Sequence, residues 1–121
     1  MEKLEFQLIL QSQEVTIVDK DGVSKEYVLK ELTGAQRDTY LDDVGGRLRY
    51  HGGKAAGLRT HKGLQAGLVA MCLVDDTDAL VPKATIQEFP SSTLQGLFKA
   101  AQILSSLQND EDEDEDEVKN E

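Results

Sequence analysis

The first part of the chain alternates between apolar and polar residues, which is the period of an extended strand. Leucine and phenylalanine occupy every second position of residues 4–10, and the alternation resumes at residues 15–17 and 27–29. An Asp-Gly pair ending at Gly22 separates the last two runs, and a glycine there can take the positive φ of a hairpin turn. We therefore expect two or three antiparallel strands within residues 3–30.

The spacing of apolar residues changes to a helical period in the middle of the chain. Thr33 and Gln36 form a candidate capping box, in which the side chain of each residue bonds the backbone N–H of the other. The apolar residues that follow predict a helix over about residues 34–50. Glycines at residues 45–46 weaken its interior and allow a kink or an early end. The "HGGK" of residues 51–54 is the clearer stop.

The remaining apolar stripes complete the predicted fold. A long stripe predicts a second helix over about residues 60–74, and its almost wholly apolar last turn identifies it as the central helix of the core. Capping boxes beginning at Thr85 and at Ser92 predict a single helical turn and then, after Pro90, a helix that reaches about Leu107. The fold class is therefore α+β, with a small N-terminal antiparallel hairpin or sheet followed by about three main helices.

Composition favours one soluble domain followed by a charged tail. The chain has 121 residues, of which 39% are apolar, and this is enough for one core. No apolar run approaches the roughly 20 residues of a membrane span, and the single cysteine, Cys72, cannot form an internal disulfide. We expect a soluble protein of a reducing compartment, with a domain over residues 1–109 and a tail over residues 110–121.

The acidic charge is concentrated in that tail. The formal net charge is −10, and residues 110–121 carry −8 of it, so the domain itself carries only −2. Neighbouring like charges repel and there is little apolar surface to bury, which predicts a disordered, extended tail. Two roles remain open, namely solubility and electrostatic contact with a basic surface. The consecutive acids are Asp110, Glu111, Asp112, Glu113, Asp114, Glu115, Asp116 and Glu117.

Residue types that carry chemistry do not form a recognisable site in the sequence. His51, His61 and Cys72 lack the spacing that places metal ligands on one helix face. The adjacent acids at residues 42–43 and 75–76 would not face each other on a helix, and the glycine-rich segment matches neither nucleotide-binding fingerprint. We therefore expect no enzyme activity, no metal site and no cofactor.

One segment, between Gly46 and Gly63, is unusually basic. It contains five lysines and arginines and two histidines, but no acid. A solvated loop between helix ends is the simplest interpretation. Binding to nucleic-acid phosphates and contact with the acidic tail or an acidic partner are the alternatives. The basic residues are Arg47, Arg49, Lys54, Arg59 and Lys62.

Three motifs follow one another along the chain. They are "KEYVLKELTGAQRDTYLDDV", then "MCLVDD" in the middle helix, and then "TIQEFPSSTLQGLFKAAQILSSL". Their order resembles that of the tail assembly chaperones of long-tailed bacteriophages of the lambda type. The resemblance covers most of residues 14–108, and its most specific parts are "LTGAQRDTYL" and the helix that begins at Pro90. None of these motifs is catalytic, so the resemblance implies a non-enzymatic function.

The resemblance also implies partners and a place of action. A chaperone of this family keeps the long tape-measure protein soluble while tail-tube subunits assemble around it, in the cytoplasm of the infected bacterium and not in the mature virion. The expected partners are the tape-measure protein and the major tail-tube protein, with a homo-oligomer as a further option. A small nucleic-acid-associated regulator that uses residues 47–62 is the alternative. The last helix is the candidate contact surface, through Leu94, Phe98, Ile103 and Leu107.

The same family commonly makes a second, longer product by a backward ribosomal slip near the end of the short reading frame. Val118, Lys119 and Asn120 can be encoded as GTA AAA AAC or GTA AAA AAT, which is a run of adenines suited to such a slip. The acidic run would then be a flexible linker within the longer product. The codons of Val118 and Lys119 test this hypothesis directly.

Overall fold

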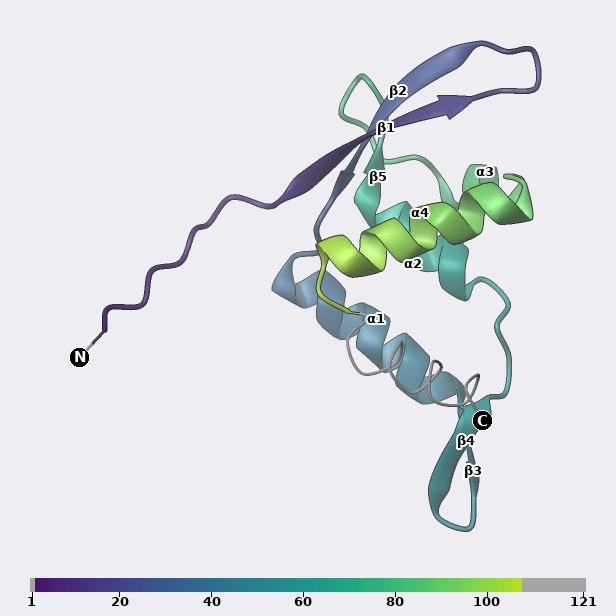
Figure 1. The fold of residues 1–121 in the computed structure, drawn as a ribbon. Coiled ribbons are helices and arrows are strands. Elements are labelled where there is room, and N and C mark those ends of the chain that lie inside the picture. The colour runs from purple at the N-terminus through teal and green to yellow at the C-terminus, as the bar shows by residue number, and fades with distance from the viewer. Residues whose placement is uncertain (1, 108–121) are drawn as a thin grey trace, which may run out of the picture.

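A three-stranded antiparallel sheet lies at one end of the computed structural model, which describes residues 2–107 (Figure 1). Strands β1 (Ser12–Val18) and β2 (Ser24–Lys30) form the expected hairpin. In its turn, Gly22 takes a φ of 82°, and Asp19 Oδ1 accepts the N–H groups of Asp21 and Val23. The α+β class, with a sheet followed by helices, is confirmed. The predicted disordered tail lies outside the described residues.

The N-terminal apolar run precedes the sheet and is not part of it. Within the described residues 2–107, the run at 4–10 pairs with no strand. The third strand is instead β5 (Leu73–Val74), which pairs with the other side of β2. Of the two or three strands expected within residues 3–30, two are therefore present, and the alternating run at 4–10 does not form a third. Alternation gives a segment the right period for a strand, but it does not supply a neighbour to receive its backbone hydrogen bonds.

Helix α1 (Gly34–Arg47) begins at the capping box that the sequence predicts. Thr33 Oγ1 accepts the Gln36 N–H at 3.2 Å, and Gln36 Oε1 accepts the Thr33 N–H at 2.9 Å. The helix continues through both glycines of the pair at 45–46 and ends at Arg47, with Leu48 as its C-cap, and not near residue 50. The helix stops there because the chain turns into a strand.

A second hairpin occupies the segment that we expected to be a solvated loop. Strand β3 (Leu48–His51) pairs antiparallel with β4 (Lys54–Leu58), and the hairpin projects from the end of the molecule opposite the main sheet (Figure 1). The glycines of "HGGK" form its turn, with φ of 60° at Gly52 and 81° at Gly53. Positive φ at both central residues suits a two-residue hairpin turn, so these glycines connect two strands.

Helix α2 (Leu64–Cys72) is shorter than predicted at both ends. It starts four residues after Thr60, and its expected last residues, Leu73 and Val74, form β5 opposite Leu29 and Val28 of β2. A short apolar run is compatible with a buried strand as well as with a buried helix. The choice here depends on the free edge of β2, which the local sequence does not reveal.

The last two helices start after prolines and not at the predicted side-chain caps. Pro82 is the N-cap of α3 (Lys83–Gln87), and Pro90 is the N-cap of α4 (Ser91–Leu104). The capping boxes expected at Thr85 and Ser92 were wrong, because the fixed φ of proline already sets the helix entry at N-caps that lie three and two residues earlier. Helix α4 ends at Leu104, before the predicted Leu107.

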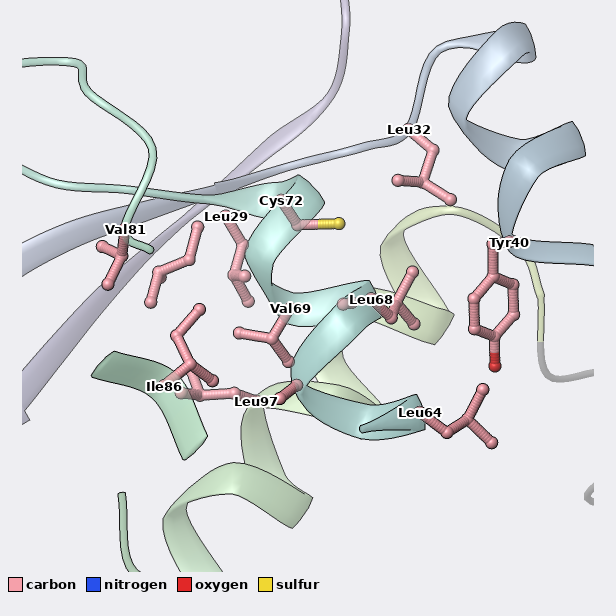
Figure 2. Close-up of a cluster of buried hydrophobic side chains, with 13 residues drawn as sticks. Leu29, Leu32, Tyr40, Leu64, Leu68, Val69, Cys72, Val81, Ile86 and Leu97 are labelled. Atoms are coloured by element: carbon pink, nitrogen blue, oxygen red, sulfur yellow. The ribbon is translucent and has the colours of Figure 1, made fainter. Parts of the chain in front are cut away.

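Helix α2 forms the centre of the core, as predicted. Leu68, Val69 and Cys72 are fully buried. Figure 2 shows them between Leu29, Ile86 and Leu97 on one side and Tyr40 on the other. These neighbours come from β2, α3, α4 and α1, so all the main elements share a single apolar cluster. Within residues 2–107, no helix has the length and apolar character needed to cross a bilayer.

Candidate functional site

Helix α4 exposes only part of the four-residue contact surface that was nominated from the sequence. Leu94 and Phe98 are half-buried and pack against the core cluster, and so does Leu107 beyond the helix end. Ile103 is the exception, with 53% of its surface exposed. Of the four residues predicted to contact a partner, the structure therefore leaves only Ile103 largely open to one.

The C-terminal end of α4 is fixed to the start of α1 by polar contacts. Ser105 is buried, and its hydroxyl accepts the Leu32 N–H at 3.0 Å. The guanidinium of Arg37 donates to the Ser105 carbonyl at 2.8 Å. Gln102, another polar residue near this end of the helix, is also buried. These contacts hold the face that carries Ile103 in one orientation.

The backbone at this point forms a closed helix end. Ser106 takes a φ of 57°, its N–H donates to the Ile103 carbonyl at 3.1 Å, and the Leu107 N–H donates to the Gln102 carbonyl at 2.8 Å. This pair of bonds is the Schellman motif, which satisfies the last carbonyls of a helix. The motif brings Leu107 back against the core, which is why a residue predicted to flank the helix is half-buried.

The largest exposed apolar surface lies on the N-terminal run, which we name the arm (residues 4–10). Figure 1 shows the arm leading away from the rest of the molecule. Phe6 is 82% exposed, and Leu8 is as exposed as in an isolated chain, at 102%. No partner contact was predicted for the arm, although the alternation of Leu and Phe contained the signal. Its exposed apolar residues are Leu4, Phe6, Leu8, Ile9 and Leu10.

An open groove of about 350 Å³ lies between β1 and α4. One wall is made by residues 15–18 of β1, and the other by residues of α4 that include Gly96, Leu97 and Ala100. Among the described strands, only β2 pairs with β1, so the outer edge of β1 borders this groove. The sequence indicated neither the groove nor its position, because both depend on how α4 crosses the sheet.

The arginines of the basic segment bind backbone carbonyls of their own segment. Arg47 donates to the Lys62 carbonyl at 2.7 Å and pairs with Asp43 at 2.9 Å. Arg49 Nη2 donates to the Ala56 carbonyl at 2.9 Å, and Arg59 Nη2 donates to the Gly46 carbonyl. Three of the five basic residues of the predicted electrostatic site thus brace the second hairpin.

The other members of the predicted electrostatic site are placed differently. Lys54 is exposed at the start of β4, and Lys62 is exposed before α2. Tyr50 on β3 is 63% exposed. The acidic residues 110–117, the predicted counterpart, lie outside the described residues.

The titratable groups that we considered for chemistry have structural surroundings. Burial raises the pKa of the Cys72 thiol to about 11, so the thiol stays protonated and unreactive within the core. Hydrogen bonds from Thr77 and Ala79 lower the pKa of Asp75, whose carboxylate organises the loop before α3. Among residues 2–107, no three histidines, cysteines or acids lie close enough to hold a metal ion.

Comparisons with protein-family models, with curated proteins and with solved structures find no match to this chain.

Proposed function

We propose that this protein is a tail assembly chaperone of a long-tailed bacteriophage, which binds the tape-measure protein and keeps it soluble while tail-tube subunits are recruited. The order of the three sequence motifs supports the family. The observation that carries the proposal is the outer face of α4, where Ile103 is exposed beside the half-buried Leu94 and Phe98 although the core is complete. Such surfaces mark places where a protein covers apolar segments of another chain.

Helix α4 suits a contact with an amphipathic helix of the client. Ile103 lies on a helix whose other face is packed against α2, and whose end is fixed by Ser105 and Arg37. A rigid helix face loses little conformational freedom when a partner binds it. The proposed contact therefore centres on Ile103, with the partly exposed edges of Leu94 and Phe98 beside it.

The test is co-expression of the chain with fragments of the tape-measure protein from the same genome. We expect the fragments to become soluble and to co-purify with the chain, and Ile103→Lys to reduce their recovery. Leu41→Lys is the matched control, because Leu41 is 45% exposed on α1. Fragments that stay insoluble and never co-purify would refute the proposal. Loss of recovery in both variants would remove α4 as the contact surface.

The second candidate function is that of a nucleic-acid-associated regulator, and the projecting β3–β4 hairpin is the observation that favours it. The hairpin presents Tyr50, His51 and Lys54 to solvent, and these residue types can stack on bases or contact phosphates. Titration with generic DNA and RNA at increasing salt tests it. Binding that weakens steeply with salt and disappears in Lys54→Ala/Tyr50→Ala would support this function, and no binding at low salt would exclude it.

A further inference from the structure

The arm (residues 4–10) has the properties of a strand that lacks a partner. Its Leu and Phe side chains recur at every second position, and residues 2–18 contain neither glycine nor proline to interrupt an extended backbone. Its apolar side chains are exposed, up to 102% at Leu8. An extended segment of this type binds by adding to a sheet edge, where its backbone provides affinity and alternate side chains enter pockets.

Strand β1 provides an edge of the matching kind. Its sequence, "SQEVTIV", has no lysine or proline and only one charged residue, Glu14. Lysine, proline and other charged residues are the types with which exposed sheet edges are usually protected from pairing. The groove beside this edge is lined largely by apolar side chains from β1 and α4, and its volume of about 350 Å³ is at the lower end of the range for binding pockets. The arm and β1 are also equal in length, since each spans seven residues.

The arm is directed away from the groove of its own molecule. The Glu31 N–H donates to the Gln11 carbonyl at 2.8 Å, and the Gln11 N–H donates to the Glu31 carboxylate at 2.7 Å. These bonds extend the line of β1 as far as Gln11, so the arm leaves the sheet along the strand direction (Figure 1). To return to its own β1, the chain would have to reverse at Gln11 and Ser12, which would break these bonds and the pairing of Ser12 with Lys30.

The apolar residues of the arm and those of β1 that pack on the core alternate out of phase with each other. Leucine and phenylalanine occupy the even positions of the arm, whereas the β1 side chains that pack on the core, Val15 and Ile17, occupy odd positions. Successive side chains of a strand point to opposite faces. If the arm simply continued β1, its apolar side chains would therefore face away from α4 and stay in water.

We propose that the arm of a second copy of this chain occupies the groove, so that residues 4–10 of one molecule lie along the β1 edge of the other, with Phe6 and Leu8 against α4. Two copies can exchange arms reciprocally, as expected for a closed symmetric pair. The four leucine and phenylalanine side chains at the even positions of the arm bury roughly 400 Å² per arm. Two arms and the two grooves that they cover bury about four times that area, roughly 1,600 Å², which is typical of a stable interface.

The test is the mass of the full chain in solution, measured by sedimentation equilibrium over a concentration series. We expect a reversible dimer, weakened about tenfold or more by Phe6→Lys/Leu8→Lys. These side chains contact nothing that holds the fold, and lysine brings the net charge of −10 closer to zero, so charge repulsion cannot explain a loss of pairing. Leu41→Lys, on the exposed side of α1, is the matched control and should dimerise normally.

The groove provides an independent variant. A Cβ added at Gly96 meets no atom within 4 Å, so Gly96→Leu should fold and fill the groove. We expect it to be monomeric, with an unfolding midpoint at least as high as that of the wild type. A synthetic peptide of residues 2–11 should bind a chain that lacks residues 2–10, and should fail to bind the same chain carrying Gly96→Leu.

Three outcomes overturn the proposal. A wild-type chain that is monomeric throughout the series shows that the arm does not bind a second copy. A dimer that persists in both Phe6→Lys/Leu8→Lys and Gly96→Leu uses another surface. A monomer in which the arm mutations shift the NMR signals of Val15 and Ile17 has its own arm in the groove. Because the chain is measured alone, none of these outcomes depends on the proposed chaperone function.

Discussion

The two hairpins of this molecule are stabilised in different ways. In β1–β2, Val15, Ile17 and Tyr27 pack against the core and Leu29 is fully buried. In β3–β4, nearly every residue is exposed, and only Leu48 and Leu58 are half-buried at the base. The first hairpin is part of the core, whereas the second stands outside it.

Polar contacts replace burial in the second hairpin. Arg47, Arg49 and Arg59 donate to carbonyls within or beside it, and the Arg59 N–H donates to the Arg47 carbonyl at 2.7 Å. An isolated two-stranded hairpin is at best marginally stable in water. These bonds and the glycine turn must therefore provide the stabilisation that a buried apolar face provides in the first hairpin. A high local content of arginine can thus serve the fold of its own segment.

The largest expected difference comes from deleting an apolar side chain in each hairpin. Leu29→Ala in β2 should lower the free energy of unfolding by about 3 kcal/mol, because it leaves a cavity in a packed core. Tyr50→Ala in β3 should change it by less than about 0.5 kcal/mol. Urea unfolding followed by circular dichroism measures both. Similar losses in the two variants would mean that the second hairpin is also part of the core.

Alkaline pH probes the core beneath the first hairpin through Cys72. The folded-state pKa is raised from 9.0 to about 11, so folding favours the neutral thiol. This contribution is fully present below pH 9 and is lost as the pH rises toward 11, by up to about 2 kcal/mol. Unfolding of the wild type and of Cys72→Ala at pH 8 and pH 10.5 isolates the effect, and the two proteins should differ less in stability at the higher pH. A constant difference would contradict the burial of the thiol.

Arginine bracing is tested with Arg47→Ala. Loss of the Arg47 hydrogen bond to the Lys62 carbonyl should destabilise β3–β4 locally by about 1 kcal/mol. The ion pair with Asp43 should contribute little, because the Asp43 side chain is 44% exposed. Faster amide hydrogen exchange in β3 and β4, with unchanged exchange in β1 and β2, is the expected result. Lys54→Ala removes the same charge without a bracing bond and should leave exchange unaltered.

The smallest pair of effects concerns two glycines of opposite kind. Gly46→Ala should stabilise the protein by about 0.5–1 kcal/mol, because Gly46 lies within α1 and an added Cβ meets no atom within 4 Å. Gly53→Ala should destabilise the β3–β4 hairpin by about 1 kcal/mol, because φ is 81° there. Thermal unfolding measures the first effect and hydrogen exchange the second. Opposite signs are required, and equal signs would refute this account of the turn.

The elements that the sequence predicted are those whose signals are local. The capping box at Thr33 and Gln36, the Asp-Gly turn and the apolar stripe of α2 each involve residues close in the chain. Their interactions are decided within a few residues, so pattern and propensity suffice. The α+β class follows from the order of these elements.

The elements that it missed depend on distant neighbours. Leu73 and Val74 form a strand only because β2 has an edge available, and the β3–β4 hairpin needs Arg47 and Arg59 to reach carbonyls across it. Ser105 is a polar residue whose burial the local sequence does not reveal, because its partners Leu32 and Arg37 come from the start of α1. At the candidate contact surface, Leu94 and Phe98 lie on the apolar stripe that packs against the core and the helix end brings Leu107 back to it, so of the four named residues only Ile103 stays largely exposed.

The junction between α2 and β5 has a mechanical consequence. Helix α2 ends at Cys72 and β5 begins at Leu73, with no residue between them to act as a hinge. The helix and the sheet are thus joined directly, and α4 packs along the same helix. A load applied by a client at Ile103 would be transmitted to the sheet with little bending in between. Compliance is left to the projecting β3–β4 hairpin, so adaptation to partners of varied shape falls to that hairpin.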